Sequence, residues 1–211
     1  MAKPFRGFEG TLRASVEVLS RSSSVSKKRP RTVFTGKLLT VTQSFSPKGE
    51  RSPLHETVHH PGSCVILPLL NSSTLLLLRQ FRPSIGKVLW EVPAGTLEPG
   101  ESPQRCAKRE VEEETGYRAG RLRRLTIFYP SPGFCTEKMY LFLAEGLEPF
   151  SQTLEPDEKI RVHALSFQKA FQLLRQGKIR DAKTLIALYI LRNRQKKRHQ
   201  NLLHPNLRSS L

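Results

Sequence analysis

The sequence predicts an α+β fold in which helices cover a mixed β-sheet. Extended segments come first along the chain, a helical segment follows, a second group of extended segments comes next, and two helical segments lie near the C-terminal end. This order is typical of a layered sandwich. No internal repeat is visible, and 211 residues suffice to bury a complete hydrophobic core within one domain.

A small β-hairpin is expected ahead of the main domain. Residues 37–43 and 54–60 have the composition of strands, and the segment between them supplies proline and glycine for a turn. We therefore expect an N-terminal β segment over residues 33–61, followed by the main domain over residues 62–194.

The main domain opens with two apolar runs, residues 64–70 and 74–79, that we expect to pair as a buried hairpin in the mixed sheet. A loop rich in glycine and proline is expected over residues 94–101. Further strands are expected over residues 88–92, 125–129, 139–144 and 160–165.

Three helices are expected. The first follows Ser102, a good N-cap residue, has Pro103 in its first turn, and ends before Gly116. Apolar residues at helical spacing predict the other two helices over residues 167–176 and 182–191.

Most of the basic charge lies outside the expected domain. The formal net charge is +17, from 35 Lys and Arg against 18 Asp and Glu. Residues 1–32 carry eight basic and two acidic side chains, and residues 192–211 carry six basic and no acidic ones. We therefore expect basic tails over residues 1–32 and 195–211, the first of them disordered, that make weak contacts with polyanions.

Composition also limits the cellular setting. No apolar run approaches the ~20 residues needed to span a bilayer, so no membrane association is expected. Three distant cysteines without a zinc-ligand spacing exclude a disulfide scaffold or a zinc finger and fit a reducing compartment. We expect a cytoplasmic protein; the Arg- and Ser-rich residues 1–32 leave organellar import as the alternative.

An acidic cluster on the first helix is the strongest indication of function. Glu110, Glu113 and Glu114 stand at positions i, i+3 and i+4, so their carboxylates converge on one helix face. Like charges at that spacing repel, and a hard divalent cation such as Mg²⁺ or Mn²⁺ among them would offset the repulsion. The alternative interpretation is a solvated acidic face.

The acidic cluster belongs to a longer pattern, Gly-x5-Glu-x7-Arg-Glu-U-x-Glu-Glu-x-Gly-U, in which U is a bulky apolar residue. This pattern is the Nudix box, and the chain resembles Nudix hydrolases. The resemblance implies an α/β/α sandwich with a mixed sheet, and metal-dependent hydrolysis of a diphosphate. The matching residues are Gly95, Glu101, Arg109, Glu110, Val111, Glu113, Glu114, Gly116 and Tyr117, the last being aromatic where an aliphatic residue is usual.

The resemblance also assigns the residues of the metal site. Glu113 and Glu158 are the carboxylates implied to act on the attacking water, and Glu155 or Asp157 is an alternative to Glu158. Arg109 is expected to tie the helix to the loop before it. The implied ligands of Mg²⁺ or Mn²⁺ are the backbone carbonyl of Ala94 and the carboxylates of Glu110, Glu113, Glu114 and Glu158.

The segments that flank the box resemble the ADP-ribose pyrophosphatase branch of the family. Pro132 stands 16 positions after Gly116, which is the spacing associated with ADP-ribose hydrolysis. The other matching segments are residues 79–83, 90–95, 158–162 and 177–184.

These flanks imply a set of substrate-binding residues. Arg82 matches an arginine that contacts the diphosphate, a role that suits a planar guanidinium. Glu91 matches an acidic residue that lines the site; the alternative is a solvated glutamate at a strand end. His55 stands where relatives often have an arginine, so Arg51 is the alternative for that contact. The loop expected over the terminal ribose contains Pro132, Gly133 and Phe134.

The resemblance therefore implies Mg²⁺-dependent hydrolysis of ADP-ribose to AMP and ribose 5-phosphate. In relatives the N-terminal strands build a dimer, so residues 33–61 are expected to join two copies as a homodimer. One alternative is a pyrophosphatase for a UDP- or GDP-sugar. Another is an RNA-associated Nudix protein, an idea that the basic ends motivate.

Overall fold

The computed structural model describes residues 29–45, 53–154 and 159–203. The chain forms two compact units, Met1–Val58 and His59–Leu211. The sequence alone places the corresponding boundary between residues 61 and 62.

The N-terminal unit contains a three-stranded sheet in the order β1-β2-β3. β1 and β2 run antiparallel, whereas β2 and β3 correspond to the two strands of the expected hairpin, whose turn lies outside the described residues. β1 is an additional strand. Because every residue of β1 is exposed, it lacks the alternation of buried and exposed side chains that announces a strand. The strands are β1 (Arg31–Thr35), β2 (Thr40–Phe45) and β3 (Pro53–His59).

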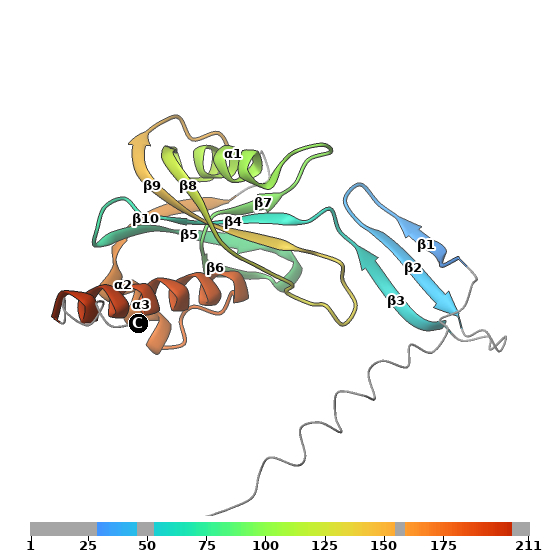
Figure 1. Cartoon of the computed structure of the whole chain (residues 1–211). Coiled ribbons are helices and arrows are strands. Elements are labelled where there is room, and N and C mark those ends of the chain that lie inside the picture. The colour runs from blue at the N-terminus through green and yellow to red at the C-terminus, as the bar shows by residue number, and fades with distance from the viewer. Residues whose placement is uncertain (1–28, 46–52, 155–158, 204–211) are drawn as a thin grey trace, which may run out of the picture. The chain divides into compact units, whose positions relative to one another are not determined.

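The C-terminal unit contains two sheets (Figure 1). One has the strand order β7-β4-β9-β8, and the other has the order β10-β5-β6. β4 runs parallel to β9 and antiparallel to β7, so the first sheet is mixed, as expected. The strands are β4 (Ser63–Pro68), β5 (Thr74–Arg82), β6 (Lys87–Glu91), β7 (Ala94–Thr96), β8 (Tyr117–Phe128), β9 (Met139–Pro149) and β10 (Ile160–Ser166).

β4 and β5 do not form the hairpin expected from the sequence. They lie in different sheets, and an isolated bridge between Leu69 and Leu75 and hydrogen bonds to the carbonyl of Thr74 join their ends. β4 pairs with β7 and β9, and β5 pairs with β10 and β6, so each strand has a partner on both edges. The expectation was wrong because a run that is apolar on both faces indicates burial without indicating its pairing partner.

Helices cover the sheets on two sides, which confirms the α/β/α sandwich. Cys64 and Ile66 of β4 pack in one cluster with residues of α1. The intervening Val65 and Leu67 pack in a second cluster with residues of α2 and α3, because successive side chains of a strand point to opposite faces. Figure 1 shows α1 on one side of the sheets and both other helices on the opposite side. The helical elements are the short 3₁₀ turn η2 (Pro83–Ile85), α1 (Pro103–Thr115), α2 (Phe167–Arg175) and α3 (Ala182–Leu203).

Local signals set both ends of α1. The Ser102 hydroxyl accepts a hydrogen bond from the N–H of Arg105 at 3.3 Å, which confirms the predicted N-cap. Gly116 has a φ of 72°, in the left-handed region that favours glycine, and its N–H donates to the carbonyl of Glu112 at 3.0 Å. The helix that carries the acidic cluster therefore begins and ends as the sequence predicts.

Two other segments differ from expectation. Residues 94–101, expected as a loop, begin with the three-residue strand β7. Helix α3 continues to Leu203, past the expected end at residue 191, and so enters the segment 195–211 that the sequence sets apart as a tail. No helix in the described part of the chain is long and apolar enough to cross a membrane.

Candidate active site

Helix α1 lies against strand β7. A Cβ atom added at Gly95 of β7 would overlap the Glu110 carboxylate, so glycine at this position allows the Glu110 side chain to lie directly on the main chain of the strand. Glu110 is 7 % exposed, and its Oε1 accepts a hydrogen bond from Arg109 Nη1 at 2.6 Å. The contact with Glu110 therefore accounts for the glycine at the start of the box.

Glu114 contacts the neighbouring residue of the same strand. The N–H of Ala94 donates to Glu114 Oε2 at 2.9 Å, and Glu114 is 2 % exposed. Its main-chain carbonyl accepts from Gln152 Nε2 at 2.7 Å, which ties the end of α1 to the segment after β9. The structure therefore brings Glu110, Glu114 and the main chain of Ala94 together at β7.

The oxygen atoms of these residues fit a hard divalent cation. Carboxylate and carbonyl oxygens are the ligands that Mg²⁺ and Mn²⁺ prefer, and neighbouring buried carboxylates gain stability from a cation. Arg109 Nη1 donates to both Glu110 Oε1 and Glu113 Oε2, at 2.6 and 2.9 Å, so these two carboxylates share one helix face. No group of three or more His, Cys, Asp or Glu side chains among the described residues surrounds a common metal position. The ligand assignment therefore stays a prediction.

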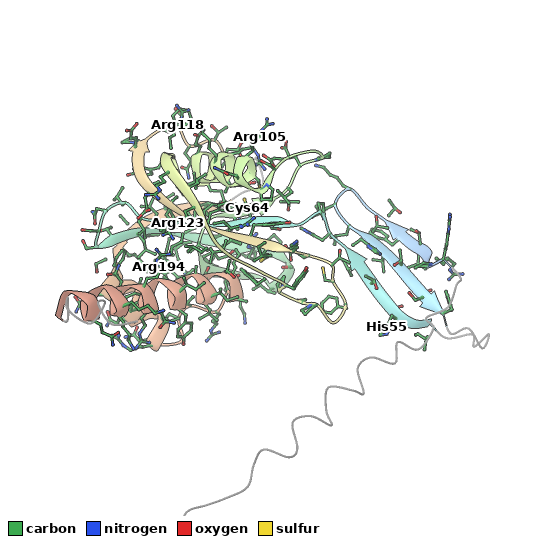
Figure 2. The ribbon with its side chains drawn as sticks, in the orientation of Figure 1. His55, Cys64, Arg105, Arg118, Arg123 and Arg194 are labelled. Atoms are coloured by element: carbon green, nitrogen blue, oxygen red, sulfur yellow. The ribbon has the colours of Figure 1, made fainter. Side chains whose placement is uncertain are left out.

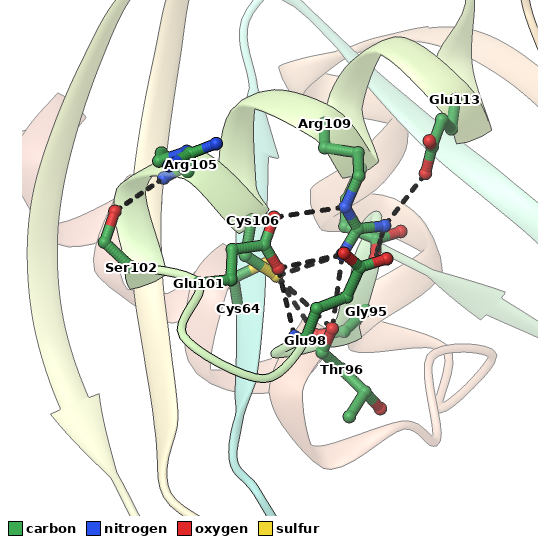
Figure 3. A network of polar contacts seen from close by, with 11 residues as sticks. Cys64, Gly95, Thr96, Glu98, Glu101, Ser102, Arg105, Cys106, Arg109 and Glu113 are labelled. Carbon is green, nitrogen blue, oxygen red and sulfur yellow. Dashed lines mark hydrogen bonds and ion pairs between the residues drawn. The ribbon is translucent and has the colours of Figure 1, made fainter.

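Arg109 ties α1 to the loop that precedes it (Figure 3). Its Nε and Nη2 donate to the two oxygens of Glu101 at 3.2 and 3.1 Å, and Nη2 also donates to the carbonyl of Thr96 at 3.2 Å. Burial opposes the charged form, yet Glu101 and the helix glutamates hold the pKa of Arg109 above its ordinary value. The pKa of Glu101 is lowered: burial raises it, and the hydrogen bond from Arg109 outweighs that effect. The arginine thus has the tying role that its place in the box implies.

Glu112, the fourth glutamate of α1, pairs with a different arginine. Arg118 Nε donates to Glu112 Oε1 at 2.9 Å, and the Arg118 guanidinium lies 3.9 Å from the ring centroid of Phe150. Figure 2 shows Arg118 beyond the C-terminal end of α1. Glu112 is therefore a matched internal control for its three neighbours.

A second polar cluster surrounds Glu91 at the end of β6. Arg82 Nε donates to Glu91 Oε1 at 2.9 Å, and Arg82 Nη2 donates to Glu91 Oε2 at 2.7 Å. Lys183 of α3 forms an ion pair with Glu91 Oε2. The Glu91 side chain is 1 % exposed, which excludes the alternative of a solvated strand-end glutamate. Both carboxylate oxygens of Glu91 thus bind cationic side chains. Its expected contact with substrate stays a prediction.

Electrostatics connect the two clusters. Burial raises the pKa of the Glu91 carboxyl, but Arg82 and Lys183 lower it by more, so its pKa lies below the ordinary value. Hydrogen bonds to Glu91 raise the pKa of Arg82, and Glu114 of α1 contributes to this shift. The charge of Arg82 therefore interacts with that of Glu114.

Sequence reasoning assigned no role to Lys183. It marked the segment 177–184 as part of the resemblance, and that segment was the available signal. Glu91 and Lys183 stand 92 positions apart in the chain, and no periodic pattern links residues at such a separation. The partner became visible in the fold.

The other predicted residues belong to other parts of the chain. Phe134 is 58 % exposed in the loop between β8 and β9, and the space around Gly133 is open. His55 lies on β3 in the N-terminal unit. The predicted catalytic or metal-binding Glu158, with its alternatives Glu155 and Asp157, and Arg51 lie outside the described residues.

Among the cavities that the described residues of the C-terminal unit line, two are open to solvent and large. One, of about 600 Å³, lies between α1 and residues 150–153 and includes Glu113 in its lining. The other, of about 800 Å³, lies on β5, β6 and β10, where the Arg79 guanidinium stacks 5.0 Å from the Trp90 ring centroid and His163 meets the same ring edge-on. The first cavity adjoins the box carboxylates.

Comparison with known proteins shows the family of the chain. The NUDIX domain model matches residues 58–188, and the chain belongs to this family of hydrolases. It is 38 % identical over 163 residues to the ADP-ribose pyrophosphatase of Bacillus subtilis (strain 168), covering 75 % of this chain and 88 % of the relative.

Other relatives have different names. The chain is 34 % identical to the methanol dehydrogenase activator of Bacillus methanolicus, covering 80 % of this chain and 92 % of the relative. It is 35 % identical to the GDP-mannose pyrophosphatase of Salmonella typhi, covering 62 % and 72 %. A solved structure described as an ADP compounds hydrolase matches with a TM-score of 0.64 at 22 % identity, covering 82 % of this chain and 97 % of that chain. This structural likeness confirms the fold.

Proposed function

We propose that the protein is a divalent-metal-dependent pyrophosphatase that splits ADP-ribose into AMP and ribose 5-phosphate. The observation that carries this proposal is the meeting of Glu110, Glu114 and the main chain of Ala94 at β7, where the charge of Arg82 interacts with that of Glu114. Similarity to the Bacillus subtilis ADP-ribose pyrophosphatase over most of both chains supports the substrate.

The residues at β7 would hold Mg²⁺ or Mn²⁺. The carboxylates of Glu110 and Glu114 and the carbonyl of Ala94 are the proposed ligands, with Glu113 and Glu158 as further ligands. Bound metal would supply positive charge against the diphosphate oxygens and acidify the attacking water.

Side chains around this position would bind and orient the substrate. Two of the five N–H donors of Arg82 bind Glu91, and the other three have no partner among the described residues, so they can donate to phosphate oxygens. Glu113 is 39 % exposed and can accept the proton of the attacking water, a role for which Glu158 is the alternative. The terminal ribose would lie under the loop that contains Pro132, Gly133 and Phe134.

A GDP-sugar or UDP-sugar pyrophosphatase is the second candidate. The GDP-mannose pyrophosphatases support it, at 35–36 % identity over 62 % of this chain. The ADP-ribose pyrophosphatase matches at higher identity over more of the chain, which favours the first candidate. An RNA-associated role is supported by the basic ends alone, and their termini lie outside the described residues.

A substrate panel tests the proposal. The full chain is incubated with ADP-ribose, UDP-glucose, GDP-mannose, NADH and a capped RNA, each with Mg²⁺ and with Mn²⁺, and kcat/KM is measured from product release by anion-exchange chromatography. ADP-ribose should give the highest value, with AMP and ribose 5-phosphate as products. A higher value for GDP-mannose or UDP-glucose would overturn the substrate assignment.

We also infer a homodimer that uses the N-terminal unit, in a cytoplasmic enzyme. The exposed apolar side chains on β1 and β3 support a partner surface: Val33 is 43 % exposed, Phe34 56 % and Leu54 52 %. Replacement of Val33 and Phe34 by aspartate should convert a dimer to a monomer in light scattering. A monomeric parent chain would contradict the inference.

A further inference from the structure

The first turn of α3 is fixed to the end of β6. Asp181 caps the helix, because its Oδ2 accepts from the N–H of Thr184 at 2.9 Å and from the Thr184 hydroxyl at 2.6 Å. The same Thr184 oxygen accepts from the N–H of Val92 at 2.9 Å, and Thr184 is fully buried. The Thr184 hydroxyl therefore joins the helix start to the strand end.

Lys183 projects from the first turn of α3 onto Glu91. Its Nζ contacts Glu91 Oε2 and donates to Asp181 Oδ1 at 2.9 Å, and its side chain is 9 % exposed. Two carboxylates thus hold one buried ammonium group. Because Asp181 also caps the helix, the position of Lys183 is set by the fold rather than by Glu91 alone.

Glu91 in turn sets the plane of the Arg82 guanidinium. Two parallel hydrogen bonds hold the fork of Arg82, whose side chain remains 35 % exposed. A carboxylate held by Arg82 alone could rotate together with it. The ion pair with Lys183 removes that freedom, because Glu91 Oε2 binds both cations.

We propose that Lys183 is a positioning residue for diphosphate binding: it fixes Glu91, and Glu91 fixes the Arg82 guanidinium so that its remaining N–H donors can bind the substrate. This inference rests on the proposed function, in which Arg82 binds the diphosphate. It gives Lys183, in the first turn of α3, a part in substrate binding that needs no contact between its side chain and the substrate.

Replacement of Lys183 tests the proposal. Lys183→Met should raise the KM for ADP-ribose, and the Kd of ADP-ribose in EDTA by calorimetry, by about tenfold, the loss expected for one charge-assisted hydrogen bond. The kcat should change by less than about threefold, because the carboxylates of α1 are untouched. Lys178→Met, an exposed lysine of the same segment, is the control and should leave both constants unchanged.

Two further variants separate positioning from stability. The double variant Lys183→Met with Glu91→Gln should bind ADP-ribose no more weakly than Glu91→Gln alone, since Lys183 acts through Glu91. Leu188→Ala should lower the Tm while leaving the Kd nearly unchanged, because it removes a buried side chain of α3 and keeps the contacts of Lys183. If Lys183→Met does not fold, Lys183→Gln replaces it and should weaken binding in the same way.

The outcomes distinguish this inference from the proposed function. If Arg82→Met leaves the KM and Kd of ADP-ribose unchanged, Arg82 does not bind the diphosphate and the proposed function loses its anion site. If Arg82→Met weakens binding but Lys183→Met and Lys183→Gln do not, the positioning role alone is overturned. Strict additivity of the Lys183 and Glu91 effects would also overturn it.

Discussion

Gly95 of β7 and Glu110 of α1 are packed so closely that a methyl group on Gly95 would occupy the position of the Glu110 carboxylate. The loop and the helix of the box are therefore joined at the point where metal binding is proposed. The box begins with glycine because the Glu110 carboxylate occupies the space that a larger side chain would need.

Gly95→Ala should impair activity much more than stability. The added methyl group displaces the Glu110 carboxylate, which can swing toward solvent on a flexible side chain, so we expect a loss of about 100-fold in kcat/KM with a Tm decrease of only a few degrees. Steady-state kinetics and thermal unfolding measure the two effects. Near-normal activity of Gly95→Ala would contradict the placement of Glu110 in the active site.

Glu114→Gln should lower activity by about 100-fold, because the substitution removes a carboxylate from a site that needs oxygen ligands with negative charge. Titration with Mn²⁺, followed by electron paramagnetic resonance, should show weaker binding. Glu112→Gln is the matched control on the same helix, since Glu112 pairs with Arg118, and it should stay within about twofold of the parent. Equal effects of the two substitutions would contradict the metal-site assignment.

Arg109→Lys should destabilise the enzyme. Lysine cannot reproduce the paired hydrogen bonds to Glu101 together with the bond to the carbonyl of Thr96. We expect a loss of about 2 kcal/mol in the free energy of unfolding, at the lower end for a broken ion pair because Arg109 is partly exposed. Urea unfolding measures it. An unchanged midpoint would show that the loop does not depend on the arginine.

Glu91 should make the stability of the protein depend on pH. The pKa of Glu91 in the folded chain lies below its value in the unfolded chain. The ionised carboxylate therefore stabilises the fold at pH values above the unfolded pKa, and this stabilisation is lost as the pH falls through the lowered pKa. The free energy of unfolding should therefore decrease between about pH 5 and about pH 3. Glu91→Gln should reduce this slope in urea unfolding series, and an unchanged slope would contradict the prediction.

Cys64 should be unreactive in the folded protein. Its hydrogen bond with Cys106 Sγ, at 2.8 Å, and its complete burial raise the pKa of its thiol. Ellman's reagent should therefore titrate Cys135, which is partly exposed, well before the other two thiols, and all three in denaturant. Cys135→Ser should remove the fast reaction; a remaining fast thiol would be inconsistent with the burial of Cys64 and Cys106.

The sequence predicts best what depends on neighbouring residues. The cap at Ser102, the stop at Gly116 and the spacing of Glu110, Glu113 and Glu114 are local, and the structure has the first two as expected. Partner choice is not local. β4 is parallel to β9, more than 70 residues away, so its apolar pattern could not exclude pairing with β5.

The same reason separates the two halves of the candidate site. The box carboxylates come from one continuous segment and were found by their spacing. The cluster of Arg82, Glu91 and Lys183 unites β5, β6 and α3, and its third member has no signal in the sequence beyond the segment that contains it. Long-range ion pairs of this kind require the fold.

The tie between α3 and β6 has a consequence for synthesis of the protein on the ribosome. Glu91 is synthesised 92 residues before Lys183. The nascent chain therefore carries the Glu91 carboxylate without its ammonium partner until most of the C-terminal unit has been made. The cluster therefore closes late, and a chain released before residue 183 would lack it.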